Sequence, residues 1–160
     1  MLHLIPAPLH RAALRLAHEL RKRWWRLARP DLTGCCVVGT DEAGRVLLVR
    51  HSYGSGIWSL PGGALHRGED PALAAQREWT EEIGCLLASL RAVAVVDHDL
   101  HGARNTVHLY TGVVVGDPVA DGREIAEIGF FARDALPVRR SRIVDERLDL
   151  IFQAADEFAA

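Results

Sequence analysis

The sequence is poor in cysteine and has no long uncharged apolar run. Its three cysteines cannot close a disulfide framework, and none belongs to a CxxC pair, so we expect reduced thiols and a cytoplasmic location. No stretch of about 18 uncharged apolar residues is present, so no membrane-spanning helix is expected. Arg and Glu interrupt the apolar residues near the N-terminus every few positions, which argues against a secretory signal. Internal repeats and low-complexity tracts are also lacking.

The composition that remains is that of one globular domain with a basic appendage. The chain has 160 residues, of which 49% are hydrophobic and 25% charged. Its net charge of −2 hides an asymmetry: residues 1–30 carry seven basic side chains and one acidic one, whereas residues 31–160 carry 12 basic and 20 acidic ones. We therefore expect a basic arm over residues 1–30 and the main domain over 31–160. The asymmetry favours an anionic partner, or packing of the arm on the acidic domain.

The basic arm shows the periodicity of an amphipathic helix over residues 9–28, which Pro30 ends. Its apolar residues recur at three- and four-residue steps: Leu9, Ala13, Leu16, Leu20, Trp24 and Leu27. We expect this stripe to pack on its own domain or on a second copy, as a homodimer. An anionic membrane and a nucleic acid are the alternatives, although the sequence has no recognised RNA-binding motif.

The rest of the chain mixes strands and helices without regular alternation. β-rich runs at 35–40 and 45–51 flank a glycine-containing turn and predict a hairpin, in which Cys35 and Cys36 point to opposite faces. Further strands are expected at 86–96, 106–115 and 125–131, with a polar loop at 98–105, and helices at 70–83 and about 142–156. This order predicts an α/β fold with a mixed sheet flanked by helices.

The helix at 70–83 has strong local signals at both ends. Asp70 is a favourable N-cap, Pro71 suits the first helical position, and Gly84 is a natural stop.

Three carboxylates share one face of this helix. Glu78, Glu81 and Glu82 stand at positions i, i+3 and i+4, where they repel one another. Two of them lie in the last turn, where the helix dipole also disfavours negative charge. Arg77 or a divalent cation would compensate them, and oxygen ligands suit Mg²⁺ or Mn²⁺. For such a triple by itself, a solvated acidic face is the alternative.

The loop before the helix adds two features to this cluster. Gly62 and Gly63 allow the backbone to approach a ligand closely, and Glu69 is placed to reach the same ion from the other side. From Gly63 to Cys85 the residues fit the pattern G-x5-E-x7-R-E-U-x-E-E-x-G-U, where U is hydrophobic. This pattern resembles the signature of the Nudix hydrolase superfamily, with Trp79 and Cys85 in hydrophobic slots that fit less closely. From about residue 32 onward the order of elements is also similar to that family. The resemblance implies the Nudix fold, an α/β/α sandwich around a mixed sheet, here with an extra N-terminal helix.

The resemblance also implies an activity. Members of this family cleave a nucleoside diphosphate linked to another group, by attack of water on phosphorus with the help of Mg²⁺ or Mn²⁺. Carried onto this sequence, the metal ligands would be Gly63, Glu69, Glu78, Glu81 and Glu82. A module of the same fold that binds a nucleotide without hydrolysing it is the alternative, and an interaction protein directed by the basic arm is another.

The resemblance assigns catalytic roles to Arg77, Glu78 and Glu81. Arg77 would orient the glutamates by ion pairing, and Glu78 is the expected general base. Glu124 and Glu127 are further candidates for the base, because they lie near the strand expected to enter the ligand side of the sheet.

The substrate is less visible in the sequence. Tyr53 and Trp58 are candidates to stack on a base, although core packing is at least as good an explanation for Trp58. His98, His101 and Glu127 are further substrate-binding candidates, and for the two histidines a solvated loop is the alternative. Residues that mark the ADP-ribose, dinucleoside polyphosphate and coenzyme A subgroups are missing. We therefore expect a general nucleotide or nucleotide-sugar pyrophosphohydrolase.

Overall fold

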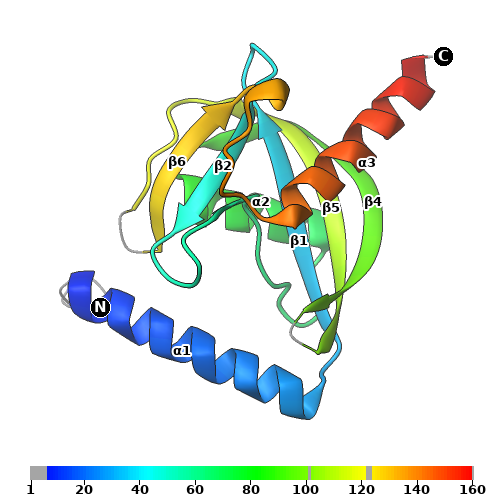
Figure 1. Ribbon diagram of the computed structural model, residues 1–160. Coiled ribbons are helices and arrows are strands. Elements are labelled where there is room, and N and C mark those ends of the chain that lie inside the picture. The colour runs from blue at the N-terminus through cyan, green and yellow to red at the C-terminus, as the bar shows by residue number, and fades with distance from the viewer. Residues whose placement is uncertain (1–6, 101, 122–123, 160) are drawn as a thin grey trace.

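The computed structural model describes residues 7–100, 102–121 and 124–159 (Figure 1). It confirms the predicted order of helices and strands, whereas the candidate His101 lies outside the described residues. The elements are α1 (Ala7–Ala28), β1 (Leu32–Thr40), β2 (Val46–His51), β3 (Trp58–Ser59), α2 (Pro71–Ile83), β4 (Leu86–Leu100), β5 (Ala103–Val115), β6 (Ile125–Phe131), a short 3-10 helix (Arg133–Ala135) and α3 (Arg142–Ala159).

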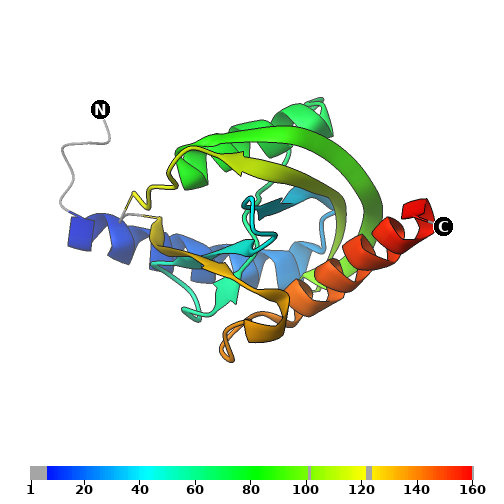
Figure 2. The ribbon, with the colours of Figure 1, turned by 90° about the horizontal axis from the view of Figure 1, so that it is seen from above.

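The strands form one mixed sheet. Its order is β3-β2-β1-β5-β4, and β6 pairs with β2. β1 and β5 run parallel, and the other pairs of neighbouring strands run antiparallel. α2 lies on one face of the sheet and α3 on the other (Figure 1, Figure 2). The predicted α/β class and the sandwich arrangement are confirmed.

Two hydrophobic clusters hold these layers together. Alternation along each strand sends neighbouring residues to opposite faces. In β1, for example, Cys35 faces the cluster under α2 and Cys36 the cluster under α3, as predicted. The α2 cluster includes Val37, Leu47, Val49, Trp79 and Tyr110, and the α3 cluster includes Val38, Leu48, Leu109, Val144 and Leu148.

The predicted hairpin of β1 and β2 is confirmed only next to its turn. The two strands pair at Thr40 and Val46, and β1 then pairs along its whole length with β5. The segment before α2 takes the other edge of β1: the Cys35 N–H donates to the Gly63 carbonyl at 2.9 Å, and the Val37 N–H donates to the Pro61 carbonyl at 3.0 Å. This pairing fixes the glycine loop against the sheet beside α2.

The polar loop expected at 98–105 was wrong. β4 continues to Leu100 and β5 begins at Ala103, with a tight turn at Gly102, whose φ is 89°. The exposed polar side chains find partners across the two strands, since Asp97 accepts hydrogen bonds from Thr106 Oγ1 and Arg104 Nη2, both at 2.6 Å. His98 is therefore a strand residue paired opposite Asn105.

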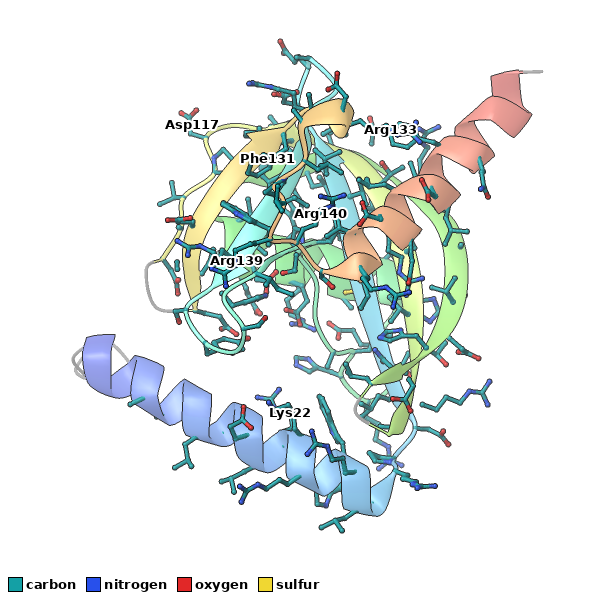
Figure 3. The ribbon with its side chains drawn as sticks, viewed as in Figure 1. Lys22, Asp117, Phe131, Arg133, Arg139 and Arg140 are labelled. Atoms are coloured by element: carbon teal, nitrogen blue, oxygen red, sulfur yellow. The ribbon has the colours of Figure 1, made fainter. Side chains whose placement is uncertain are left out.

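α1 lies along one end of the molecule (Figure 1), and its apolar stripe is exposed. Leu16, Leu20, Trp24 and Leu27 are 63%, 55%, 55% and 86% exposed. Lys22, on the opposite side of the helix, is half-buried and faces the body (Figure 3). The expectation that the stripe packs on its own domain is therefore wrong, because the opposite side of the helix, where Lys22 and Trp25 are half-buried, is the one turned toward the body. No helix in the described part of the chain is long and apolar enough to cross a membrane.

Candidate active site

α2 presents its acidic face to the glycine loop because both of its ends are fixed. Asp70 Oδ1 accepts hydrogen bonds from the N–H groups of Ala72 at 2.9 Å and Leu73 at 3.2 Å, and Pro71 begins the helix. Gly84 ends it in the left-handed conformation, with φ 72°. Both predicted ends are confirmed. The helix buries its apolar side, including Trp79 and Ile83, and also Glu82, which shares the acidic face with Glu78 and Glu81.

The two glycines of the loop are needed for close approach. A Cβ at Gly63 would lie 2.3 Å from Glu78 Cδ, and a Cβ at Gly62 would lie 2.2 Å from the Cys35 carbonyl oxygen. Gly62 also has φ 146°, and its N–H donates to Glu82 Oε2 at 2.9 Å. Backbone and carboxylates are therefore in direct contact at these two positions.

Arg77 connects the carboxylates. Its guanidinium binds Glu69 with two parallel hydrogen bonds, from Nε to Oε1 at 2.8 Å and from Nη2 to Oε2 at 2.9 Å. Nη1 donates to Glu78 at 2.7 Å and to Glu81 at 3.3 Å, and Nη2 also donates to the Ala64 carbonyl at 3.1 Å. One cation therefore ties the loop and the acidic face of the helix together.

The carboxylates sit in unlike environments. Burial raises the pKa of Glu82 to about 8, against the lowering effect of the Gly62 N–H, and neighbouring carboxylates raise it further. Burial also raises the pKa of Glu78, although Arg77 opposes this. The hydrogen bonds from Arg77 lower the pKa of Glu69 to about 2. The site therefore holds two glutamates whose ionised forms are poorly stabilised without a further positive charge.

Of the two downstream candidates, the structure brings Glu124 toward this cluster. Its Oε1 accepts a hydrogen bond from the Tyr53 hydroxyl at 3.0 Å, and its charge raises the pKa of both Glu78 and Glu82. Glu127 instead pairs with Arg50 across β2 and β6, with Arg50 Nε at 2.9 Å from Oε2. Tyr53 therefore shares the neighbourhood of the acidic face, and Glu127 has a different partner.

Trp58 and His98, the other substrate-binding candidates among the described residues, lie on the α3 side of the sheet. Trp58 packs edge-on against Phe131, with ring centroids 5.0 Å apart (Figure 3 labels Phe131), and belongs to the core under α3. His98 Nδ1 lies 3.5 Å from Nη2 of Arg147, a buried side chain of α3. The sequence gives no signal for this contact beyond the placement of Arg147 one turn from Val144 on the buried face of the helix.

A comparison with protein families identifies the fold. A model described as "NUDIX domain" matches residues 30–151. The chain belongs to the NUDIX domain family. The match begins after α1 and ends within α3, so α1 lies outside the NUDIX domain.

Similar proteins agree with this assignment. An ADP-ribose pyrophosphatase of Mycobacterium tuberculosis is 34% identical over 119 residues, which cover 68% of this chain and 58% of that protein. A crystal structure of a MutT NUDIX hydrolase from Burkholderia pseudomallei has a TM-score of 0.69 at 28% identity, covering 76% of this chain and 98% of that one. A UDP-X diphosphatase structure has a TM-score of 0.69 at 27% identity, covering 89% and 72%. The chain thus spans little more than half the length of the mycobacterial relative.

NUDIX hydrolases generally use divalent metal ions, and the residues present here fit such an ion. The acidic face of α2 supplies oxygen ligands. The loop backbone at Gly63 lies so close to Glu78 that a Cβ at this position would collide with it. The Gly63 carbonyl accepts hydrogen bonds from the Cys35 N–H at 2.9 Å and from the Cys35 thiol at 3.7 Å. In the described residues no three metal-ligating side chains surround one point, and Arg77 bridges the carboxylates in this arrangement.

Proposed function

We propose that the chain is a divalent-metal-dependent pyrophosphohydrolase that cleaves a nucleoside diphosphate linked to a second group. The main support is the contact between the Gly63 backbone and the acidic face of α2, with Arg77 bridging Glu69, Glu78 and Glu81. Such an acidic site holds a polyanionic substrate only through bridging cations. Family membership and the names of two relatives, an ADP-ribose pyrophosphatase and a UDP-X diphosphatase, support the same class of reaction.

In this proposal Glu78, Glu81 and Glu82, with the Gly63 carbonyl, hold Mg²⁺ or Mn²⁺. The ion supplies polarisation of the phosphoryl oxygens and a lower pKa for bound water. Both oxygens of Glu69 are already occupied by Arg77, and Oε2 also accepts from the His66 N–H at 2.8 Å. This favours Glu69 as a positioning residue for Arg77 over the ligand role that the family signature suggests.

The reaction places a water oxygen on phosphorus and breaks one phosphoanhydride bond, releasing a nucleoside monophosphate and the phosphorylated second group. Glu78 remains our candidate for the general base, because it lies against the loop and its raised pKa favours proton uptake. Glu124 is the second candidate, since the Tyr53 hydroxyl orients its carboxylate. Tyr53 itself is then placed to contact the substrate.

The test is hydrolysis of a substrate panel by the purified chain with Mg²⁺ or Mn²⁺: ADP-ribose, a UDP-sugar, nucleoside triphosphates, a dinucleoside polyphosphate and capped RNA. We expect Glu78→Gln and Glu82→Gln each to lower kcat by about a hundredfold or more. Glu42→Gln is the matched control, because Glu42 is exposed in the turn between β1 and β2. Tight nucleotide binding without turnover in any divalent metal would contradict the proposal and favour a binding module.

A further inference from the structure

α1 carries an apolar face that the body of the molecule leaves uncovered. Leu16, Leu20, Trp24 and Leu27 recur along one side of the helix at three- and four-residue steps, and each of them is more than half exposed. The opposite side faces the body, where Lys22 and Trp25 are half-buried. Figure 1 shows the helix lying apart from the sheet, with its outer side open. A stripe of this length on a surface helix marks an interaction site.

The charges around this stripe indicate what covers it. At 3.6 residues per turn, Arg23 borders the stripe on one side and is exposed. On the other side, the guanidinium carbon of Arg21 lies 5.9 Å from the ring centroid of the half-buried Trp25, so this arginine is turned toward the body. Arg26 and Arg29 are exposed farther along the same helix and its end. The one acidic residue of this helix, Glu19, pairs with Lys22. The stripe is therefore apolar at its centre and positive along one border.

This pattern disfavours a second copy of the chain as the partner. Two stripes packed together would bring the bordering arginines of both copies close to one another, with no free acidic side chain on the helix to offset them. An anionic lipid surface meets both requirements, because it offers apolar chains to the stripe and phosphate groups to the arginines. Trp24 suits such a boundary, where the indole ring is half in apolar and half in polar surroundings.

We propose that α1 docks the chain on an anionic lipid surface, with Leu16, Leu20, Trp24 and Leu27 in the acyl region and the exposed Arg23 and Arg26 at the phosphates. The helix lies along the surface and does not cross it. The NUDIX match begins after this helix, so docking is a property added to the catalytic domain. If the chain does not bind lipid, the proposed hydrolysis is unaffected, because docking is measured with vesicles and hydrolysis with nucleotides.

The test is sedimentation of the full chain with vesicles of phosphatidylcholine alone or mixed with phosphatidylglycerol. We expect binding to the mixed vesicles only, weakened by salt. The double variant Leu20→Glu/Trp24→Glu should lower the partition coefficient by about tenfold or more, because it places two charges in the acyl region. Arg23→Gln and Arg26→Gln should each lower it by about fivefold. Leu86→Glu is the matched control, since Leu86 is 69% exposed on β4 and should not change binding.

A second readout separates lost docking from lost folding. Trp24→Leu keeps the stripe apolar, so this variant should still bind mixed vesicles. It should lose most of the quenching of tryptophan fluorescence by brominated lipid that we expect for the wild type. Far-UV circular dichroism and the thermal transition of each variant should match the wild type.

Two results would overturn the proposal. One is a wild-type chain that mixed vesicles do not retain, or a double variant that binds them as the wild type does. The other is a dimer in light scattering that Leu20→Glu/Trp24→Glu converts to a monomer in the absence of any vesicle binding, which would assign the stripe to a second copy.

Discussion

At the scale of single residues, Gly39 of β1 leaves room for the indole of Trp79. A Cβ at position 39 would lie 2.2 Å from Trp79 Cη2 and 2.7 Å from Cζ3, and Trp79 is fully buried. We expect Gly39→Ala to lower the free energy of unfolding by about 1–3 kcal/mol through overpacking, as urea denaturation will measure. Trp79→Leu should then be less destabilising in the Gly39→Ala background than in the wild type. Equal effects in the two backgrounds would contradict the steric explanation.

Glu82 makes the stability of the metal-free chain depend on pH. Its carboxyl ionises near the ordinary value for Glu in the unfolded chain but at about 8 in the folded chain, because it is buried. Between these values the folded chain holds a proton that the unfolded chain has lost, so the free energy of unfolding falls as pH rises.

The variant Glu82→Gln isolates this contribution. In chelator, the wild type should lose stability relative to Glu82→Gln between about pH 5 and pH 8, by up to about 1.4 kcal/mol per pH unit. The stabilisation by protonated Glu82 is complete below the ordinary pKa of Glu and is lost above about pH 8. Denaturation at a series of pH values measures this difference. If the free energy of unfolding changed with pH in the same way for the wild type and Glu82→Gln, Glu82 would not be the cause of the pH dependence.

Arg147 gives a prediction on the other face of the sheet. Burial, and then the positive charge of Arg147, lower the pKa of His98. Arg147→Met should raise that pKa, but not fully to its ordinary value, because the burial of the imidazole remains. An NMR titration of the His98 ring measures it. Arg142→Met, at an exposed position of α3, should leave the pKa unchanged, and an equal shift in both variants would contradict the role of Arg147.

At the scale of elements, α2 depends on its N-cap. Asp70→Ala removes the acceptor for the N–H groups of Ala72 and Leu73, and should lower the free energy of unfolding by about 1 kcal/mol. Asp70→Ser keeps a side-chain oxygen at the cap and should recover most of that loss. Thermal unfolding of both variants measures the difference. A loss as large for Ser as for Ala would show that Asp70 acts in some way other than capping.

The sequence predicts α2 well because its signals are local. The cap, the proline and the terminal glycine lie within the helix or beside it, and the spacing of Glu78, Glu81 and Glu82 fixes a shared face without knowledge of the fold. The glycine loop was expected to approach a ligand or metal, and the structure adds that Gly63 lies directly against Glu78.

Features that depend on distant segments were not predictable. The polar residues after Val96 predict a loop, but cross-strand bonds from Arg104 and Thr106 to Asp97 make that segment a strand. The hydrogen bond from Tyr53 to Glu124 joins residues that are 71 positions apart in the sequence. The pairing of β2 with β6 brings them together. Gly39 likewise explains how a residue as bulky as Trp79 fits into a hydrophobic position of the signature. This space is visible only in the packing of α2 on β1.

At the scale of the whole molecule, divalent metal should stabilise the folded chain. An ion that binds the folded state alone adds about 2.7 kcal/mol to the free energy of unfolding at a hundredfold excess over its Kd. We expect Mg²⁺ or Mn²⁺ to raise the Tm of the wild type and of the control Glu42→Gln, but not that of Glu78→Gln/Glu82→Gln. A rise of equal size in the double variant would place the ion elsewhere on the protein.

The bridging position of Arg77 bears on how the protein is made and handled. Because the guanidinium already neutralises part of the acidic face, we expect a newly synthesised chain to complete its helix before it meets any metal, and purification in chelator to leave it intact. An uncharged side chain at position 77 would remove this internal counter-ion. The chain would then need the bound metal in order to fold, whereas the chain with Arg77 does not.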